Sequence, residues 1–243
     1  ENSKSAVESF KTLRDKISQA GVIVMMSGIV GNNTHRPLDI NEFRAFAMVD
    51  DLVPLIFINS NDSVNGKLFS LLHEFAHICI GNNSLYNDRY SSGTRVSKAE
   101  SVSNAVAAEI LVPQVMFEKK WKEIDKFDDP IKTIDVLTKY FSCGTTVIAR
   151  KALDNGYIDY SVYRKLSQIA VNRYNEKRKK EKEQGGGGDY YRTAASRIDT
   201  RFFKSLVSSV HEGKTLYTDA FILTNTNRST FENLVNKMGG GSK

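Results

Sequence analysis

The stretch LLHEFAHICIG, residues 71–81, constrains the fold of this chain most, because it combines an apolar helical stripe with two histidines. The apolar residues continue a stripe that starts at Leu68 and recurs at helical spacing, and Gly81 is a typical helix C-cap. His73 and His77 are four residues apart, so on a helix they lie on the same face. The stretch therefore predicts a core helix that presents two imidazoles together.

The arrangement His73-Glu74-x-x-His77 is typical of zinc peptidases. Two imidazoles at this spacing can bind one zinc ion at about 2.0–2.1 Å each. Glu74 lies roughly 100° around the helix, where it can act as general base on a zinc-bound water. A core helix with two incidental histidines is the alternative, but the whole chain has only four histidines. We therefore predict Zn²⁺, or another divalent metal, at His73 and His77, with Glu74 as the catalytic residue.

A catalytic zinc site needs a third protein ligand and keeps one position open. The metzincin pattern would require Gly at 80 and His at 83, but the chain has Ile80 and Asn83, which excludes that class. The next predicted helix, SKAESVSNAVAAEILVP, offers Glu100 and Glu109, and spacing alone leaves both open. Glu100 also fits a capping box, a role that needs no metal. Asn104, one turn after Glu100, is placed to form a hydrogen bond with a zinc-bound histidine.

The other segments predict a mostly helical α+β fold, with a small antiparallel sheet packed on the histidine helix. Residues 5–20 are expected to form an amphipathic helix, and 22–27, 43–49 and 54–59 to form strands, the last two as a hairpin. Pro54 at the start of its strand suggests a sheet edge. We hypothesise that an extended substrate segment adds to this edge.

Three parts are expected along the chain. A zinc metallopeptidase domain is predicted over residues 1–125 and a helical, helix-turn-helix-like subdomain over 126–184. A linker and a small helical C-terminal unit follow over 185–243, because GGGG at 185–188 is typical of a flexible linker.

Two segments raise the question of direct nucleic-acid binding. Residues 141–158 resemble a helix-turn-helix, but the second helix carries only Arg150 and Lys151 as cations, which favours a packing subdomain. The basic run 173–182 could attract phosphates, yet such runs are more often the solvated end of a helix. Direct nucleic-acid binding is therefore left open but not favoured.

The composition is that of an ordinary globular protein, with 40% hydrophobic and 26% charged residues. No apolar run reaches the roughly 18 residues of a membrane span, so no membrane partner is expected. Cys79 and Cys143 do not make a disulfide framework, which indicates a cytoplasmic protein. The chain begins at Glu1 and not at methionine, which leaves open a leader or an upstream domain.

Taken together, the motifs resemble those of the ImmA/IrrE family of zinc-dependent metallo-endopeptidases, a gluzincin-like HExxH group. The matching pieces are GVIV, PLIFIN, LFSLLHEFAH and ESVSNAVAAEILVP, which lie within roughly residues 5–115. In that family the first glutamate of the last motif is the third zinc ligand, so the resemblance implies this role for Glu100. Ser103, Val106 and Val112 replace the family's usual Ala, Phe and Met at packing positions.

The resemblance implies an endopeptidase that cleaves a cognate protein. Its members often act on helix-turn-helix transcriptional repressors in mobile elements and stress-response loci. The alternative is a non-cleaving, antitoxin-like binding module on a retained zinc fold, against which the intact Glu74 argues. A peptidase acting broadly on peptides is a third interpretation.

Peptide hydrolysis also needs a group that stabilises the oxyanion. The sequence offers Tyr86, Tyr90, Arg95 and His211 and does not choose among them. His35, in the polar segment GNNTHRP, is expected to be an exposed loop residue instead.

Overall fold

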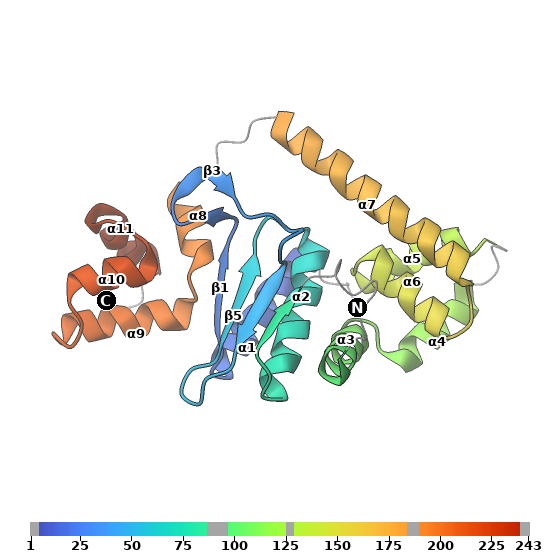
Figure 1. Ribbon diagram of the computed structural model, residues 1–243, viewed down its shortest axis with the longest axis horizontal. Helices are drawn as coiled ribbons and strands as arrows, with labels where there is room; N and C mark the ends of the chain where they lie inside the picture. Colours follow the sequence, from blue (N-terminus) through green and yellow to red (C-terminus); the bar gives the residue numbers. More distant parts are fainter. Residues whose placement is uncertain (1–4, 87–96, 125–128, 184–189, 239–243) are drawn as a thin grey trace.

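The computed structural model of the protein describes residues 5–86, 97–124, 129–183 and 190–238. These residues form a small sheet with helices against it, a helical subdomain on one side and a C-terminal helical unit on the other (Figure 1). The fold is therefore mostly helical α+β, as the sequence predicted.

The first helix, α1 (Ala6–Gln19), lies in the segment predicted to be helical and begins at a capping box. The Ser5 hydroxyl accepts a hydrogen bond from the Glu8 backbone N–H at 3.3 Å, and the Glu8 carboxylate accepts one from the Ser5 N–H at 3.0 Å. Ile17 is buried in the cluster that joins α1 to the sheet. Local caps and periodicity therefore sufficed to predict this element.

The main sheet has the strand order β1-β5-β4-β6. Its strands are β1 (Ile23–Ser27), β4 (Ala45–Met48), β5 (Leu55–Asn59) and β6 (Ser84–Tyr86). β4 and β5 form the predicted antiparallel hairpin, whereas β1 pairs with β5 in parallel. The sheet is therefore mixed and not wholly antiparallel as expected.

The prediction that Pro54 opens an edge strand is wrong, because β5 lies between β1 and β4. Pro54 precedes the first paired residue of the strand, where a missing N–H is tolerated, and its carbonyl accepts from the Ile23 N–H at 2.9 Å. Residues 55–58 are paired on both sides, with β1 and with β4. The hypothesis that a substrate segment adds to this strand is therefore overturned.

A second sheet lies in the segment expected to be a loop. β2 (Ile29–Val30) and β3 (Asn33–Pro37) form an antiparallel hairpin. All residues of β3 are exposed, including His35. The hairpin has no apolar alternation, and periodicity therefore gave no signal for it.

The helix that carries the histidine motif is α2 (Val64–Cys79). The Ser63 hydroxyl caps its start by accepting from the Gly66 N–H at 3.0 Å, and Gly81, with φ 72°, ends it. Leu71 is fully buried in the cluster between this helix, α1 and the sheet. The apolar stripe thus fixes the position of the histidines, as predicted.

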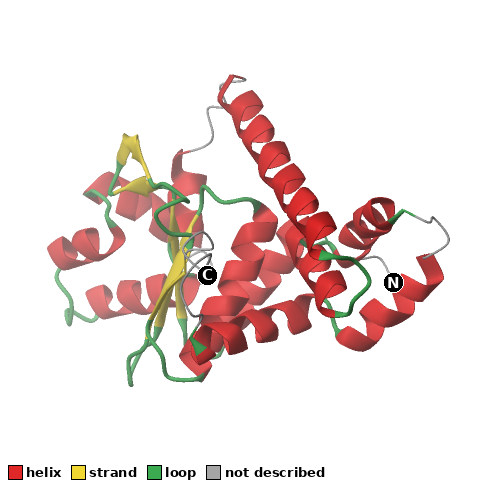
Figure 2. Cartoon of the chain, turned by 45° about the vertical axis from the view of Figure 1, so that its right-hand side comes forward, coloured by secondary structure: helices red, strands yellow, loops and turns green. Residues whose placement is uncertain are grey.

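The helical subdomain surrounds a second hydrophobic cluster that begins at Val112 and includes Phe117 and Trp121. The longest helix projects beyond the body of the protein (Figure 2). None of the described helices combines the length and the apolarity needed to cross a membrane. The helices of this region are α3 (Lys98–Leu111), α4 (Gln114–Ile124), α5 (Pro130–Phe141), α6 (Thr145–Asp154) and α7 (Tyr160–Glu183).

The turn between α5 and α6 has helix-turn-helix character. Ser142 adopts φ 50°, the left-handed conformation that ends α5. A Cβ atom at Gly144, the N-cap of α6, would lie 3.8 Å from the Cβ of Asn65 in α2. The start of α6, the part of a helix-turn-helix that contacts bases in DNA-binding proteins, therefore faces α2.

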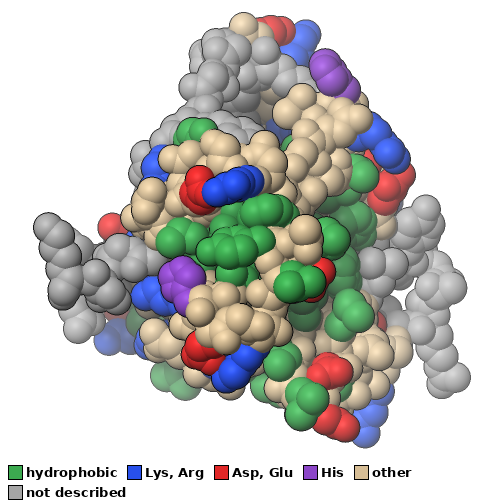
Figure 3. Space-filling model, turned by 90° about the vertical axis from the view of Figure 1, so that its left-hand side faces the viewer, with side chains coloured by type: hydrophobic (Ala, Val, Ile, Leu, Met, Phe, Trp, Pro, Cys, Tyr) green, Lys and Arg blue, Asp and Glu red, His purple; other side chains and the backbone are tan. Residues whose placement is uncertain are grey.

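The C-terminal unit packs around Phe203 and Phe231. Its helices are α8 (Tyr190–Arg197), α9 (Thr200–His211), α10 (Tyr217–Thr224) and α11 (Arg228–Met238). Hydrophobic side chains gather on the face that this unit presents (Figure 3). The large exposed ones at α10 are 54% to 77% exposed: Leu216, Tyr217, Ile222 and Leu223.

Two polar side chains, the buried Asp199 and the half-buried Arg14, attach this unit to the outer edge of β1. The Asp199 carboxylate accepts from the Val24 N–H at 3.2 Å and caps α9 by accepting from the Phe202 N–H at 3.0 Å. Arg14 donates to the carbonyls of Val24 and Ile198 at 2.8 and 3.1 Å. Backbone groups that an edge strand would otherwise leave unpaired are thereby satisfied.

We expect Asp199→Ala to lower the free energy of unfolding by about 2–3 kcal/mol, because it removes a helix cap and leaves the buried Val24 N–H without its acceptor. Urea unfolding followed by circular dichroism measures the change. Asp219→Ala, at an exposed position in the first turn of α10, is the matched control and should change stability by less than about 0.5 kcal/mol. Equal effects of the two variants would contradict this role of Asp199.

Candidate metal centre

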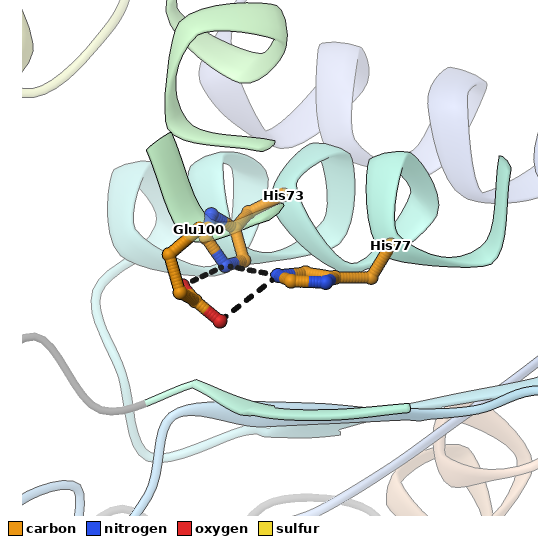
Figure 4. Close-up of side chains that lie close together, drawn as sticks. All are labelled: His73, His77 and Glu100. Atoms are coloured by element: carbon orange, nitrogen blue, oxygen red, sulfur yellow. Dashed lines mark hydrogen bonds and ion pairs between the residues drawn. The ribbon is translucent and has the colours of Figure 1, made fainter. Parts of the chain in front are cut away.

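α2 and α3 bring the three predicted ligands together (Figure 4). The Nε2 atoms of His73 and His77 are 3.2 Å apart. Glu100 places Oε2 at 3.2 Å from His73 Nε2 and Oε1 at 3.1 Å from His77 Nε2. In a tetrahedral zinc site, ligand atoms lie about 3.3–3.4 Å apart, which follows from bonds near 2.0–2.1 Å. The three side chains therefore have the spacing of a metal-binding set.

The start of α3 positions Glu100. The Ser97 hydroxyl caps this helix by accepting from the Glu100 N–H at 3.1 Å. The Glu100 carboxylate points toward both histidines (Figure 4). The backbone of Glu100 thus serves the cap, while its side chain belongs to the metal cluster.

The donor set fits zinc or another divalent metal. Two imidazoles and one carboxylate are common zinc ligands. Burial, together with the neighbouring His77, lowers the pKa of His73 to about 3, so the imidazole is neutral near pH 7 as metal binding requires. Within the described part of the chain, this is the one group of three histidine, cysteine or carboxylate side chains with such spacing.

Asn104 lies one turn after Glu100 and forms a hydrogen bond with the His73 side chain. Asn104 therefore lies beside the ligand set on α3, the helix that also carries Glu100.

Glu74 is fully buried next to the ligands. Its Oε2 accepts a hydrogen bond from the Ser84 hydroxyl, while its Oε1 has no partner among the described residues. Burial raises the pKa of Glu74 to about 8, the Ser84 hydrogen bond opposes this shift, and the Glu100 carboxylate adds to it. A bound dication would favour the ionised form of Glu74, which a general base requires.

Glu109, the alternative third ligand, has other partners. Its carboxylate accepts from Lys151 Nζ at 2.6 Å and from the Gln114 N–H at 2.8 Å. Lys151 also donates to the Val112 carbonyl. These contacts tie the end of α3 to α6, and Glu109 is therefore not part of the metal cluster.

Of the four candidate oxyanion stabilisers, only the side chain of His211 is described. Only the backbone of Tyr86 is described, at the end of β6, and Tyr90 and Arg95 lie outside the described residues. His211 is in the last turn of α9, beyond the β1 edge and away from α2 and α3 (Figure 1). His211 is therefore set aside, because its helix packs in the separate core of the C-terminal unit.

Ser84 is the residue at this site that the sequence did not reveal. It lies in the polar segment NNSLYNDRY, for which the sequence predicted neither a helix nor a strand. The one sequence feature that could have indicated Ser84 is its position shortly after Gly81, the residue that ends the histidine helix. Its approach to Glu74 depends on the pairing of β6 with β4, which local patterns do not show.

Two family models match the chain. The IrrE N-terminal-like domain (Peptidase_M78) matches residues 21–153, more than half of the chain, including every residue of the metal cluster. A domain of unknown function (DUF8813) matches residues 198–237, which contain most of α9–α11. No curated protein and no solved structure matches the chain.

Proposed function

We propose that this chain, which belongs to the family of the IrrE N-terminal-like domain, is a zinc-dependent endopeptidase acting on a cognate protein. The substrate we propose is a helix-turn-helix transcriptional repressor or a related regulator, which places the activity in the cytoplasm. The observation that carries the proposal is the buried Glu74, whose Oε1 has no partner among the described residues and whose carboxylate is close enough to Glu100 of the three-ligand cluster to interact electrostatically with it.

Each residue of the cluster has a defined part in peptide hydrolysis. His73, His77 and Glu100 would hold zinc, and Asn104 would orient His73. When bound, zinc supplies Lewis-acid activation of a water molecule and of the scissile carbonyl. Glu74 takes a proton from the water through Oε1 and passes it to the leaving amine.

A non-cleaving binding module on the same fold is the alternative function. A closed structural zinc site has four protein ligands and needs no general base. The cluster has three ligands and an additional buried glutamate. This composition favours the peptidase.

Metal removal tests the proposed function directly. The zinc-loaded chain is incubated with purified regulators encoded next to its own gene, and products are identified by mass spectrometry. We expect discrete fragments of one regulator, their loss after dialysis against a chelator, and their return with one equivalent of zinc. Fragments that persist without metal would contradict the mechanism, and intact regulators in every zinc-loaded reaction would contradict the substrate.

A further inference from the structure

The chain reverses direction directly after the histidine helix. Gly81 adopts φ 72°, and the Asn82 N–H donates to the carbonyl of His77 at 3.0 Å, which closes a Schellman-type turn. β6 then begins at Ser84. This tight return places Ser84 beside Glu74, ten residues earlier in the sequence.

Strand pairing fixes the side of the sheet on which Ser84 projects. Ser84 pairs with Ala47 of β4, and directly opposite residues in an antiparallel sheet share a face. Ala47 is 2% exposed and belongs to the core between the sheet and α2. The Asn83 side chain also accepts from the Val49 N–H at 2.6 Å, which anchors β6 to the end of β4. Backbone pairing therefore holds Ser84 on the α2 side.

The Ser84 hydroxyl donates to Oε2 of Glu74. No other hydrogen bond to the Glu74 side chain is found among the described residues. A hydrogen bond to one oxygen of a carboxylate limits the rotation of the group, while the second oxygen keeps its lone pairs free to accept a proton. General-base catalysis depends first on such geometry.

We propose that Ser84 is a positioning residue for the general base: it holds Oε2 of Glu74 so that Oε1 stays oriented to accept a proton at the metal cluster. This inference rests on the proposed function, because it requires a metal at the three ligands. Ser84 acts through Glu74 alone and is therefore expected to leave metal affinity unchanged.

A small hydroxamate tests this role without a protein substrate. When acetohydroxamic acid becomes a metal ligand, its O–H bond breaks, an oxygen–metal bond forms, and the proton passes to Oε1 of Glu74. Cobalt-loaded full-length chain reports binding through its visible spectrum. We expect Ser84→Ala to weaken hydroxamate binding about 10-fold, as for other contacts that support a metal site from outside, with cobalt affinity within about threefold of the parent.

Three further variants separate positioning from general support of the fold. Ser84→Thr keeps the hydroxyl on a strand-compatible residue and should restore binding to within about threefold. In the Glu74→Gln background, Ser84→Ala should weaken hydroxamate binding by less than a further factor of about two, because the base is already absent. Ser101→Ala, at an exposed position next to Glu100, is the matched control and should leave both hydroxamate binding and cobalt affinity unchanged.

The outcomes that overturn the proposal are distinct. Parent-like hydroxamate binding by folded Ser84→Ala, or failure of Ser84→Thr to restore it, would remove the positioning role. Tighter binding by Ser84→Ala would show that Ser84 holds Glu74 away from the metal. A parallel loss of cobalt would assign Ser84 to the ligand set instead. A chain that binds hydroxamate through Ser84 and Glu74 but cleaves no regulator would overturn only the proposed function.

Discussion

His77→Ala is expected to lose stoichiometric zinc, with an affinity about 10²–10³-fold weaker than that of the parent chain. Protein zinc sites with four ligands bind with about 10–16 kcal/mol, or roughly 2.5–4 kcal/mol for each ligand. A factor of ten corresponds to about 1.4 kcal/mol, so the loss of one ligand accounts for this range. The variant keeps only two of the three ligands, His73 and Glu100.

Metal content after dialysis and competition with a chromogenic chelator measure this loss. Thermal unfolding gives a second readout, because a metal that binds only the folded state raises its stability. Zinc should raise the melting temperature of the parent and not that of His77→Ala. His35→Ala, at an exposed histidine in β3, is the matched control and should retain zinc. Stoichiometric zinc in dialysed His77→Ala would contradict the ligand assignment.

The helices near the site could be predicted because their signals are local. The spacing of apolar residues, together with Gly81 and the capping residue Ser97, marks where α2 ends and α3 begins. Strand order carries no such signal. β1 pairs with β5 across an intervening hairpin, so neither the parallel pairing nor the central position of Pro54 could be inferred from neighbouring residues.

In the candidate site, too, residues placed by local structure could be predicted, whereas residues placed by tertiary contacts could not. His73 and His77 share one helix, and their proximity follows from helical geometry alone. Glu100 comes from another helix, and spacing left Glu109 open as an alternative until the family resemblance favoured Glu100. Ser84 depends on a strand register, which explains why the sequence did not reveal it.

Glu74→Gln is expected to reduce cleavage of the cognate regulator by about 10²–10⁴-fold, the usual contribution of a general base. Glutamine has nearly the same shape and can still accept from Ser84, but it cannot take a proton from water at neutral pH. The three metal ligands are untouched. Zinc content should therefore remain stoichiometric while turnover is lost.

The same substitution should change how the stability of the metal-free chain depends on pH. Burial raises the pKa of Glu74 from 4.5 to about 8, so in this interval the folded state holds a proton that the unfolded state has released. Stability therefore falls as the pH rises from about 4.5 to about 8. Metal-free Glu74→Gln should lack this decline, and urea unfolding across this interval measures the difference. Parallel stability curves would contradict the raised pKa.

Cleavage by Glu74→Gln also separates a peptidase from a non-cleaving module. Zinc-loaded parent and variant are compared on the same regulator by initial rate and by pull-down, with Glu176→Gln on the exposed surface of α7 as the control. A peptidase predicts that both chains bind the regulator and that the variant alone fails to cleave it. A module predicts binding by both and cleavage by neither. Turnover by the variant within about tenfold of the parent would exclude Glu74 as the base, because proton transfer by a positioned side chain contributes at least about 100-fold.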